Sequence, residues 1–78
     1  MNGVPSSPKA PELSIVVPVL DEAANIDPLV AEIRSALDGR LDYEIVYVDD
    51  GSRDGTPALL AAASASVPGF RSLRHRER

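Results

Sequence analysis

Two short apolar runs, rich in β-branched residues, are separated by a stretch with the spacing of a helix. The first run covers residues 13–17 and stops at Pro18, and the second covers residues 43–48. Both are nearly continuous in apolar character, which is typical of strands buried in a parallel sheet. A helix-length connection between such strands implies parallel pairing and a right-handed crossover, with both sheet faces covered. The two runs therefore predict an α/β fold.

The stretch between the runs predicts a helix over residues 28–38. Asp27 followed by Pro28 matches an N-cap and a proline at the first helical position, and Gly39 suits the left-handed position past the end. The apolar residues have the spacing of one helical face: Ile26, Leu29, Val30, Ile33 and Leu37.

A second helix and a third strand follow the second run. Thr56 and Pro57 repeat the cap-and-proline pattern, residues 58–63 are strong helix formers, and residues 67–69 end the helix. Residues 70–74 are expected to form a third strand. The order predicts βαβαβ with parallel strands, a partial three-layer sandwich of the Rossmann-like type.

The chain is long enough for one small domain. The chain has 78 residues. A domain of roughly 60 ordered residues buries only about 60% of its unfolded surface, so we expect marginal stability. Residues 1–12 combine Pro, Ser and Gly without an apolar core, which predicts a flexible leader before a domain over residues 13–78. This leader has the pattern of neither a signal peptide nor a membrane span. The lack of cysteine leaves the redox compartment undetermined, and a cytoplasmic location is the default expectation.

The charges are distributed unevenly. A formal net charge of -4 argues against nucleic-acid binding, although arginines occur at positions 71, 74, 76 and 78. A solvated sheet edge is the expected role of these arginines, because exposed charges usually have little structural effect. His75 among them is expected to be an exposed loop residue with no metal to bind.

The loops after the first two strands carry the chemistry. Parallel neighbours bring the ends at Pro18 to Glu22 and Val48 to Ser52 to one edge, where ligands of such sheets bind. We therefore expect the acids of the two loops to share one crevice, beside helix N-termini that offer amides to anions. These acids are Asp21, Glu22, Asp49 and Asp50.

The segment VDDGSRDGT, residues 48–56, allows several readings. Residues 50–55 match the start of an EF-hand calcium loop, but Ala61 stands where that loop needs its bidentate Glu. A phosphoacceptor Asp usually needs a Lys farther along, and Lys9 is the only lysine. Asp49 and Asp54 suit a cap or turn, and Asp54 stands where the turn leads into a helix. An acid at a strand mouth such as Asp50 is best accommodated by hydrogen bonds, for example from a nucleobase N–H or ribose hydroxyl.

Two segments together resemble the start of a family 2 glycosyltransferase. They are LSIVVPVLDEAANI, residues 13–26, and YEIVYVDDGSRDGT, residues 43–56, and the resemblance extends over about residues 13–76. The most similar group is the dolichyl- or polyprenyl-phosphate sugar transferases. The resemblance implies the N-terminal half of a GT-A domain that binds a nucleotide-diphospho sugar, with either UDP or GDP, and an acceptor such as a polyprenyl phosphate.

The resemblance also implies the binding residues. Pro18, Leu20 and Glu22 would line the base and ribose pocket, with Val48 and Asp50 completing it and Asp50 facing the base. Two positions depart from the family pattern: Leu20 replaces a common aromatic residue, which weakens base stacking, and Asp21 replaces a common Asn.

The family's D-x-D segment, which holds a divalent metal such as Mg or Mn, is expected beyond residue 78, as are the catalytic base and the acceptor site. The chain is then a fragment without catalytic or metal-binding residues, inactive alone, and a full-length form would work in the cytoplasm or at the cytoplasmic face of the membrane. The alternative function is a non-catalytic assembly module that pairs through its uncovered sheet edge, since unpaired strands associate readily.

Overall fold

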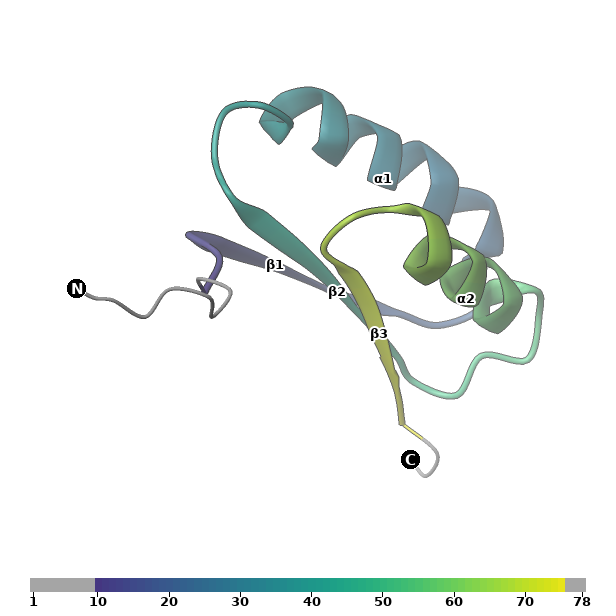
Figure 1. Ribbon diagram of the computed structural model, residues 1–78. Helices are drawn as coiled ribbons and strands as arrows, with labels where there is room; N and C mark the ends of the chain where they lie inside the picture. Colours follow the sequence, from purple (N-terminus) through teal and green to yellow (C-terminus); the bar gives the residue numbers. More distant parts are fainter. Residues whose placement is uncertain (1–9, 76–78) are drawn as a thin grey trace.

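The computed structural model describes residues 10–75, which form a three-stranded parallel sheet and two helices (Figure 1). The elements follow in the order β1 (Leu13–Val19), α1 (Ala23–Leu37), β2 (Tyr43–Asp49), α2 (Thr56–Ser66) and β3 (Phe70–Arg74). The sheet order is β1-β2-β3, so β2 is central. The predicted α/β class, the βαβαβ order and the parallel pairing are confirmed.

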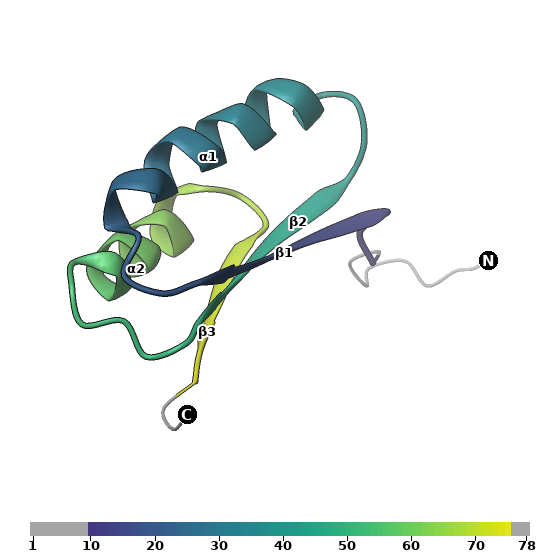
Figure 2. The ribbon, with the colours of Figure 1, turned by 180° about the vertical axis from the view of Figure 1, so that it is seen from behind.

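Both helices lie over the same face of the sheet, as the two opposite views show (Figures 1 and 2). The core forms there, between alternate residues of the strands and one side of each helix: Val19, Ile45, Tyr47 and Phe70 from the sheet, Ile26 and Val30 from α1, and Leu60 from α2. The rings of Tyr47 and Phe70 stack with their centroids 5.3 Å apart. The strands follow one another across the sheet in the order β1-β2-β3, and right-handed crossovers in the same direction place both helices on the same face. The expectation that both faces are covered was therefore wrong for residues 10–75.

The other face of the sheet is open in this part of the chain. Val16 is 60% exposed and Leu73 is 52% exposed, although both belong to strands. The central Val46 is 5% exposed because its neighbours on both strands shield it. The described residues thus form two layers of the predicted partial three-layer sandwich.

Strand β1 continues through Pro18 to Val19, two residues beyond the predicted end. Proline lacks an amide hydrogen and is tolerated in edge strands, where one side of the backbone needs no partner. Within the sheet formed by residues 10–75, β1 is such an edge, because β2 pairs with it on one side only. The prediction failed because it treated Pro18 as a residue of an inner strand.

Helix α1 begins at Ala23, five residues before the predicted start, and Pro28 lies inside it. The predicted N-cap at Asp27 was therefore wrong, and Glu22 holds the N-cap position without a side-chain cap. The end of the helix was predicted correctly to within one residue, and Gly39 has the expected positive φ of 79°. Contacts from the loop after β2, described below, hold the extra first turn.

Helix α2 and strand β3 agree closely with the sequence prediction. β3 has the predicted bounds, and α2 ends just before residues 67–69. Thr56 is the first helical residue and not the cap, which is Gly55. No helix among residues 10–75 has the length and apolarity needed to cross a membrane. The predicted flexible leader lies mainly outside the described residues.

Candidate functional site: two interlocked loops at the carboxyl edge

The loops that follow β1 and β2 lie side by side at the carboxyl edge of the sheet. The strands pair in register to their ends, with Pro18 opposite Val48 and Val19 opposite Asp49. The pairing then continues by one more bond, from the amide of Asp50 to the carbonyl of Val19 at 3.0 Å. The predicted convergence of the two loops is confirmed.

Asp21 and Ser52 connect the two loops through their side chains. The amide of Asp21 donates to Ser52 Oγ at 2.8 Å, and Asp21 Oδ1 accepts the amide of Arg53 at 2.7 Å. Asp21 has a positive φ of 50°, which Asp and Asn tolerate better than most residues. Ser52 is buried, whereas Asp21 is exposed, so the connection runs from the interior to the surface. The loops therefore behave as one unit.

Asp54 holds the first residue of both helices. Its Oδ1 accepts the amide of Thr56 at 2.9 Å, and its Oδ2 accepts the amide of Ala23 at 3.2 Å. The hydrogen bonds from Thr56 and Ala23 lower the pKa of Asp54 below its ordinary value of 3.8. The predicted role of Asp54 in the start of α2 fits these bonds, and its bond to α1 explains the early start of that helix. Because Asp54 already takes these amides, they do not offer the free anion sites expected from the sequence.

Asp49 is buried at the end of β2, with its side chain 3% exposed. Its Oδ1 accepts the amide of Ser52 at 2.8 Å, and its Oδ2 pairs with Arg74 Nη1 at 2.9 Å. Burial raises the pKa of this carboxyl, but the Ser52 hydrogen bonds and the Arg74 charge outweigh that effect and hold the pKa below 3.8. Asp49 is therefore an internal structural anion.

Arg74 is 45% exposed on β3, an outer strand of the described sheet, as predicted, but its guanidinium also makes contacts that the prediction did not include. Its Nη1 meets Asp49, and its Nη2 donates to the carbonyl of Ser52 at 3.0 Å. Arg71 likewise pairs with Glu44 at 3.2 Å. Arg76 and Arg78 lie outside the described residues. Asp49 was predicted only to cap or turn the chain, and its bond to the amide of Ser52 fits that role. The ion pair of Asp49 with Arg74 and the part played by Ser52 were missed, although the register of β2 and β3, once known, places Asp49 beside Arg74.

Asp50 faces outward, between the fixed residues Asp49 and Ser52. Its side chain is 47% exposed, and its Oδ1 lies 3.2 Å from Nδ1 of His75. His75 is 69% exposed, as predicted for a loop histidine. Asp50 thus combines a fixed backbone with an accessible carboxylate.

The five predicted binding residues are divided by the sheet. Pro18 and Val48 are register partners on the open face, and Leu20 and Asp50 lie close beyond them in the loops, with Leu20 40% exposed. Glu22 instead lines a small cavity of about 20 Å³ with residues of the helix-covered face: Val17, Val19, Asn25, Ile26, Leu29 and Tyr47. Glu22 therefore lies apart from the open-face pair, Pro18 and Val48.

The acids of the two loops do not gather into one open crevice as expected. Asp21 and Asp54 bind backbone amides, and Asp49 is paired with Arg74. Among residues 10–75, no three His, Cys, Asp or Glu side chains are grouped so that they could hold a metal ion. The residues present do not fit a divalent metal.

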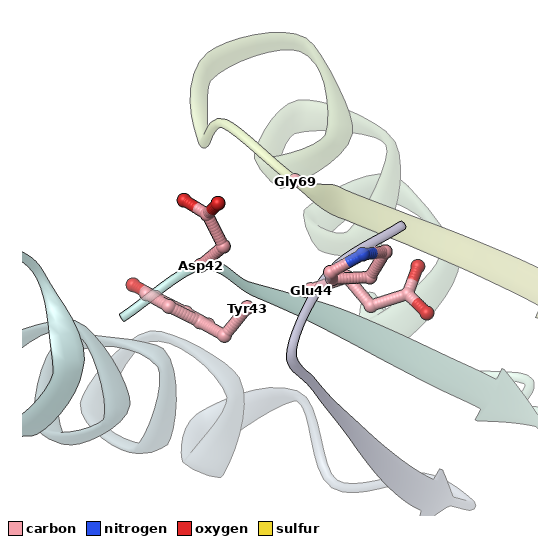
Figure 3. A pocket seen from close by; sticks show the side chains of 5 residues that line it. Asp42, Tyr43, Glu44 and Gly69 are labelled. Atoms are coloured by element: carbon pink, nitrogen blue, oxygen red, sulfur yellow. The ribbon is translucent and has the colours of Figure 1, made fainter. Parts of the chain in front are cut away.

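A larger hollow, of about 530 Å³, lies at the opposite edge of the sheet (Figure 3). It is lined by Pro11, Asp42, Tyr43, Glu44 and Gly69. Its charged groups are both carboxylates, so it is unsuited to a diphosphate. The carboxyl edge remains the better candidate site because polar groups from two loops meet there.

The parallel sheet, its one-sided helices and the joined loops at the carboxyl edge define a Rossmann-like α/β unit. The sequence profile described as "Glycosyl transferase family 2" matches residues 14–78. Because this match spans most of its length, the chain belongs to family 2 of the glycosyltransferases.

Individual relatives agree with this assignment. An undecaprenyl-phosphate 4-deoxy-4-formamido-L-arabinose transferase of Pseudomonas fluorescens is 45% identical over 56 residues, covering 70% of this chain and 16% of the relative. A dolichol-phosphate mannosyltransferase of Pyrococcus furiosus is 44% identical over 57 residues, covering 73% of this chain and 16% of the relative. Such relatives are about six times as long as the matched segment.

A solved structure shares the fold. A mannosyltransferase from Pyrobaculum calidifontis, in complex with GDP-Man and Mn²⁺, aligns with a TM-score of 0.74 and 28% identity. The alignment covers 90% of this chain and 21% of that one. The predicted family and the GT-A type of fold are confirmed.

Proposed function

We propose that this chain is the nucleotide-binding part of a glycosyltransferase that uses a nucleotide-diphospho sugar, with a polyprenyl phosphate as the acceptor class. One observation carries the proposal: Asp50 presents an accessible carboxylate from a loop that is otherwise fixed by Asp49 and Ser52. Support comes from relatives named for transfer to undecaprenyl and dolichol phosphates and from the neighbour solved with GDP-Man.

Asp50 is the proposed contact to the nucleobase. A uracil N3–H, or the N1–H and N2–H of guanine, donates to a carboxylate, and such a charged hydrogen bond contributes about 1.5–3 kcal/mol. Leu20, Pro18 and Val48 supply exposed apolar surface beside it, against which a base or ribose can pack. Glu22, on the other side of β1, is proposed to meet the ribose at the margin of the site.

The diphosphate is proposed to bind away from the first amides of α1 and α2, because Asp54 already accepts them. The neighbour was solved with Mn²⁺, whereas the residues described here do not fit a metal. We therefore expect this chain to bind the nucleoside part of the donor without transferring the sugar. In the full enzyme the site is proposed to work at the cytoplasmic side of the membrane.

The experiment is titration calorimetry of the chain with UDP and with GDP. Asp50→Ala is expected to weaken binding of the preferred nucleotide by about 10-fold or more, from loss of one charged hydrogen bond. Asp42→Ala, an exposed acid at the opposite edge, is the matched control and should leave the affinity unchanged. Equal affinities of wild type and Asp50→Ala would remove Asp50 from the site. A wild-type chain that binds neither nucleotide would overturn the proposed function.

A second candidate function is assembly through the sheet. In the described part of the chain β1 is an edge strand, and Val16 on it is 60% exposed on the open face. An unpaired edge next to an apolar face favours association with a second strand or chain.

A further inference from the structure

We propose that Arg74 is a positioning residue for the site: it clamps the loop that carries Asp50 and, through Ser52, the loop that carries Leu20. The inference rests on the proposed function for its nucleotide, but the clamp itself is a property of the fold. Arg74 lies at the end of β3, two strands away from Leu20, so its effect on that loop is indirect.

The clamp begins with the two-pronged contact of one guanidinium. Arg74 Nη1 reaches Asp49 Oδ2 at 2.9 Å, and Nη2 reaches the carbonyl of Ser52 at 3.0 Å. These two groups are on either side of Asp50 in sequence. A planar guanidinium presents its donors in a fixed fork, so binding both groups fixes the distance between them.

Asp49 closes the same turn from within. Its Oδ1 accepts the amide of Ser52 at 2.8 Å, and its Oδ2 is held by Arg74. Because the Asp49 side chain is 3% exposed, water has little access to its two oxygens, which depend on these protein partners. The turn over residues 49–52 is therefore held on both sides, while the side chain of Asp50 stays 47% exposed.

Ser52 carries the constraint across to the first loop. Its Oγ accepts the amide of Asp21 at 2.8 Å, in a loop where Asp21 adopts a φ of 50°. In the opposite direction, the amide of Arg53 in the second loop donates to Asp21 Oδ1 at 2.7 Å. A continuous series of contacts thus leads from Arg74 through Asp49 and Ser52 to Asp21, next to Leu20.

The test compares Arg74→Ala with Arg71→Ala, since both arginines lie on β3 and pair with an acid of β2. Amide hydrogen exchange, followed by NMR, is the first readout. In Arg74→Ala the amides of Ser52 and Asp21 should exchange at least 10-fold faster, while that of Ile45, bonded to the carbonyl of Gly69, keeps its rate. Arg71→Ala should leave the loop amides unchanged.

A purely structural role predicts a different pattern. If Arg74→Ala accelerates exchange at Ser52, Asp21 and Ile45 by the same factor, the residue only adds to global stability and the proposal is overturned. Arg74→Lys keeps a charge opposite Asp49 but loses the fork, so it should recover melting temperature without restoring slow exchange at Ser52. If Arg74→Ala does not fold, Arg74→Lys decides, and wild-type exchange at Ser52 in that variant overturns the clamp.

Affinity for UDP and GDP is the second readout. Arg74→Ala should weaken nucleotide binding by 10-fold or more at a temperature where it is fully folded, and Arg71→Ala should not. Unchanged affinity despite fast loop exchange would overturn the positioning role. If the wild type binds neither nucleotide, the proposed function fails, and the exchange data alone then support or overturn the clamp.

Discussion

Asp49 and Asp50 are adjacent in sequence but have opposite environments. Asp49 is buried, accepts the amide of Ser52 and pairs with Arg74, whereas the side chain of Asp50 is 47% exposed. Successive residues of a strand point to opposite faces, and the chain turns immediately after Asp49, so the two carboxylates separate. One acid maintains the loop and the other remains available to a ligand.

The depressed pKa of Asp49 makes stability depend on pH at the acid end. Its contribution is fully present above the unfolded-state value, near 3.8, and is lost as the pH falls through the lower folded value. Asp49→Asn should therefore make the fall in unfolding free energy below about pH 4 less steep. At neutral pH the substitution should cost about 1–3 kcal/mol, because it breaks a buried charged hydrogen bond.

Chemical denaturation between pH 2 and pH 7 measures this effect. Glu32→Gln, an exposed acid on α1, serves as the control and should keep the wild-type slope. Asp38, Glu44 and Asp54 also have lowered pKa values and will maintain part of the acid dependence. An Asp49→Asn variant with the full wild-type slope would contradict the assignment.

At the scale of elements, the sequence predicted what depends on local pattern. The bounds of β3, the end of α1 shortly before Gly39 and the end of α2 follow from turn residues and apolar spacing, which act over a few residues. The start of α1 was wrong because Asp54, 31 positions from Ala23, holds its first turn. The convergence of the two loops could be predicted from the strand topology. The pairing of Asp49 with Arg74 could not, because it depends on the register of β2 and β3 and on the directions of the two side chains.

The early start of α1 also places Pro28 inside the helix. It occupies an interior position, where it cannot donate to the carbonyl of Ala24. Pro28→Ala should restore that bond and raise the free energy of unfolding by about 1–2 kcal/mol. Pro57 stands in the first turn of α2, where no such bond is needed. Pro57→Ala should instead lower the free energy of unfolding by about 0.5 kcal/mol, because the unfolded chain gains conformational entropy when the proline is removed.

Thermal and urea unfolding of the two proline variants measures the difference. Opposite signs are the expected result. If Pro28→Ala were as destabilising as Pro57→Ala, then α1 would begin in solution near Pro28, as the local sequence suggested.

At the scale of the whole molecule, the main feature is the contrast between the two sheet faces. Over residues 10–75 the helices cover one face, and the other face exposes Val16 and Leu73. A chain of this size has little apolar surface to bury, so an uncovered face reduces its stability and favours association.

Val16→Lys tests association through this surface. The lysine should keep the protein monomeric at concentrations where the wild type associates, with little change in stability because the side chain is 60% exposed. Ala61→Lys adds the same charge on the exposed surface of α2 and should not prevent association. Sedimentation velocity over a concentration series distinguishes them. If both lysines prevent association equally, the cause is the change in net charge and not the loss of this surface. A wild type that is monomeric at all concentrations would contradict the assembly role.

Val19, Asp49 and Arg74 are register partners across the three strands. This row also affects which strand register is most stable. A shift of β3 by one residue would place Leu73 or His75 opposite Asp49 and turn Phe70 away from the core. A buried carboxylate without its cation is strongly unfavourable. A shifted pairing of β2 with β3 would therefore be destabilised at Asp49, at the end of the strands, as well as in the core. The ion pair that holds the loops therefore also favours the observed strand register over its one-residue alternatives.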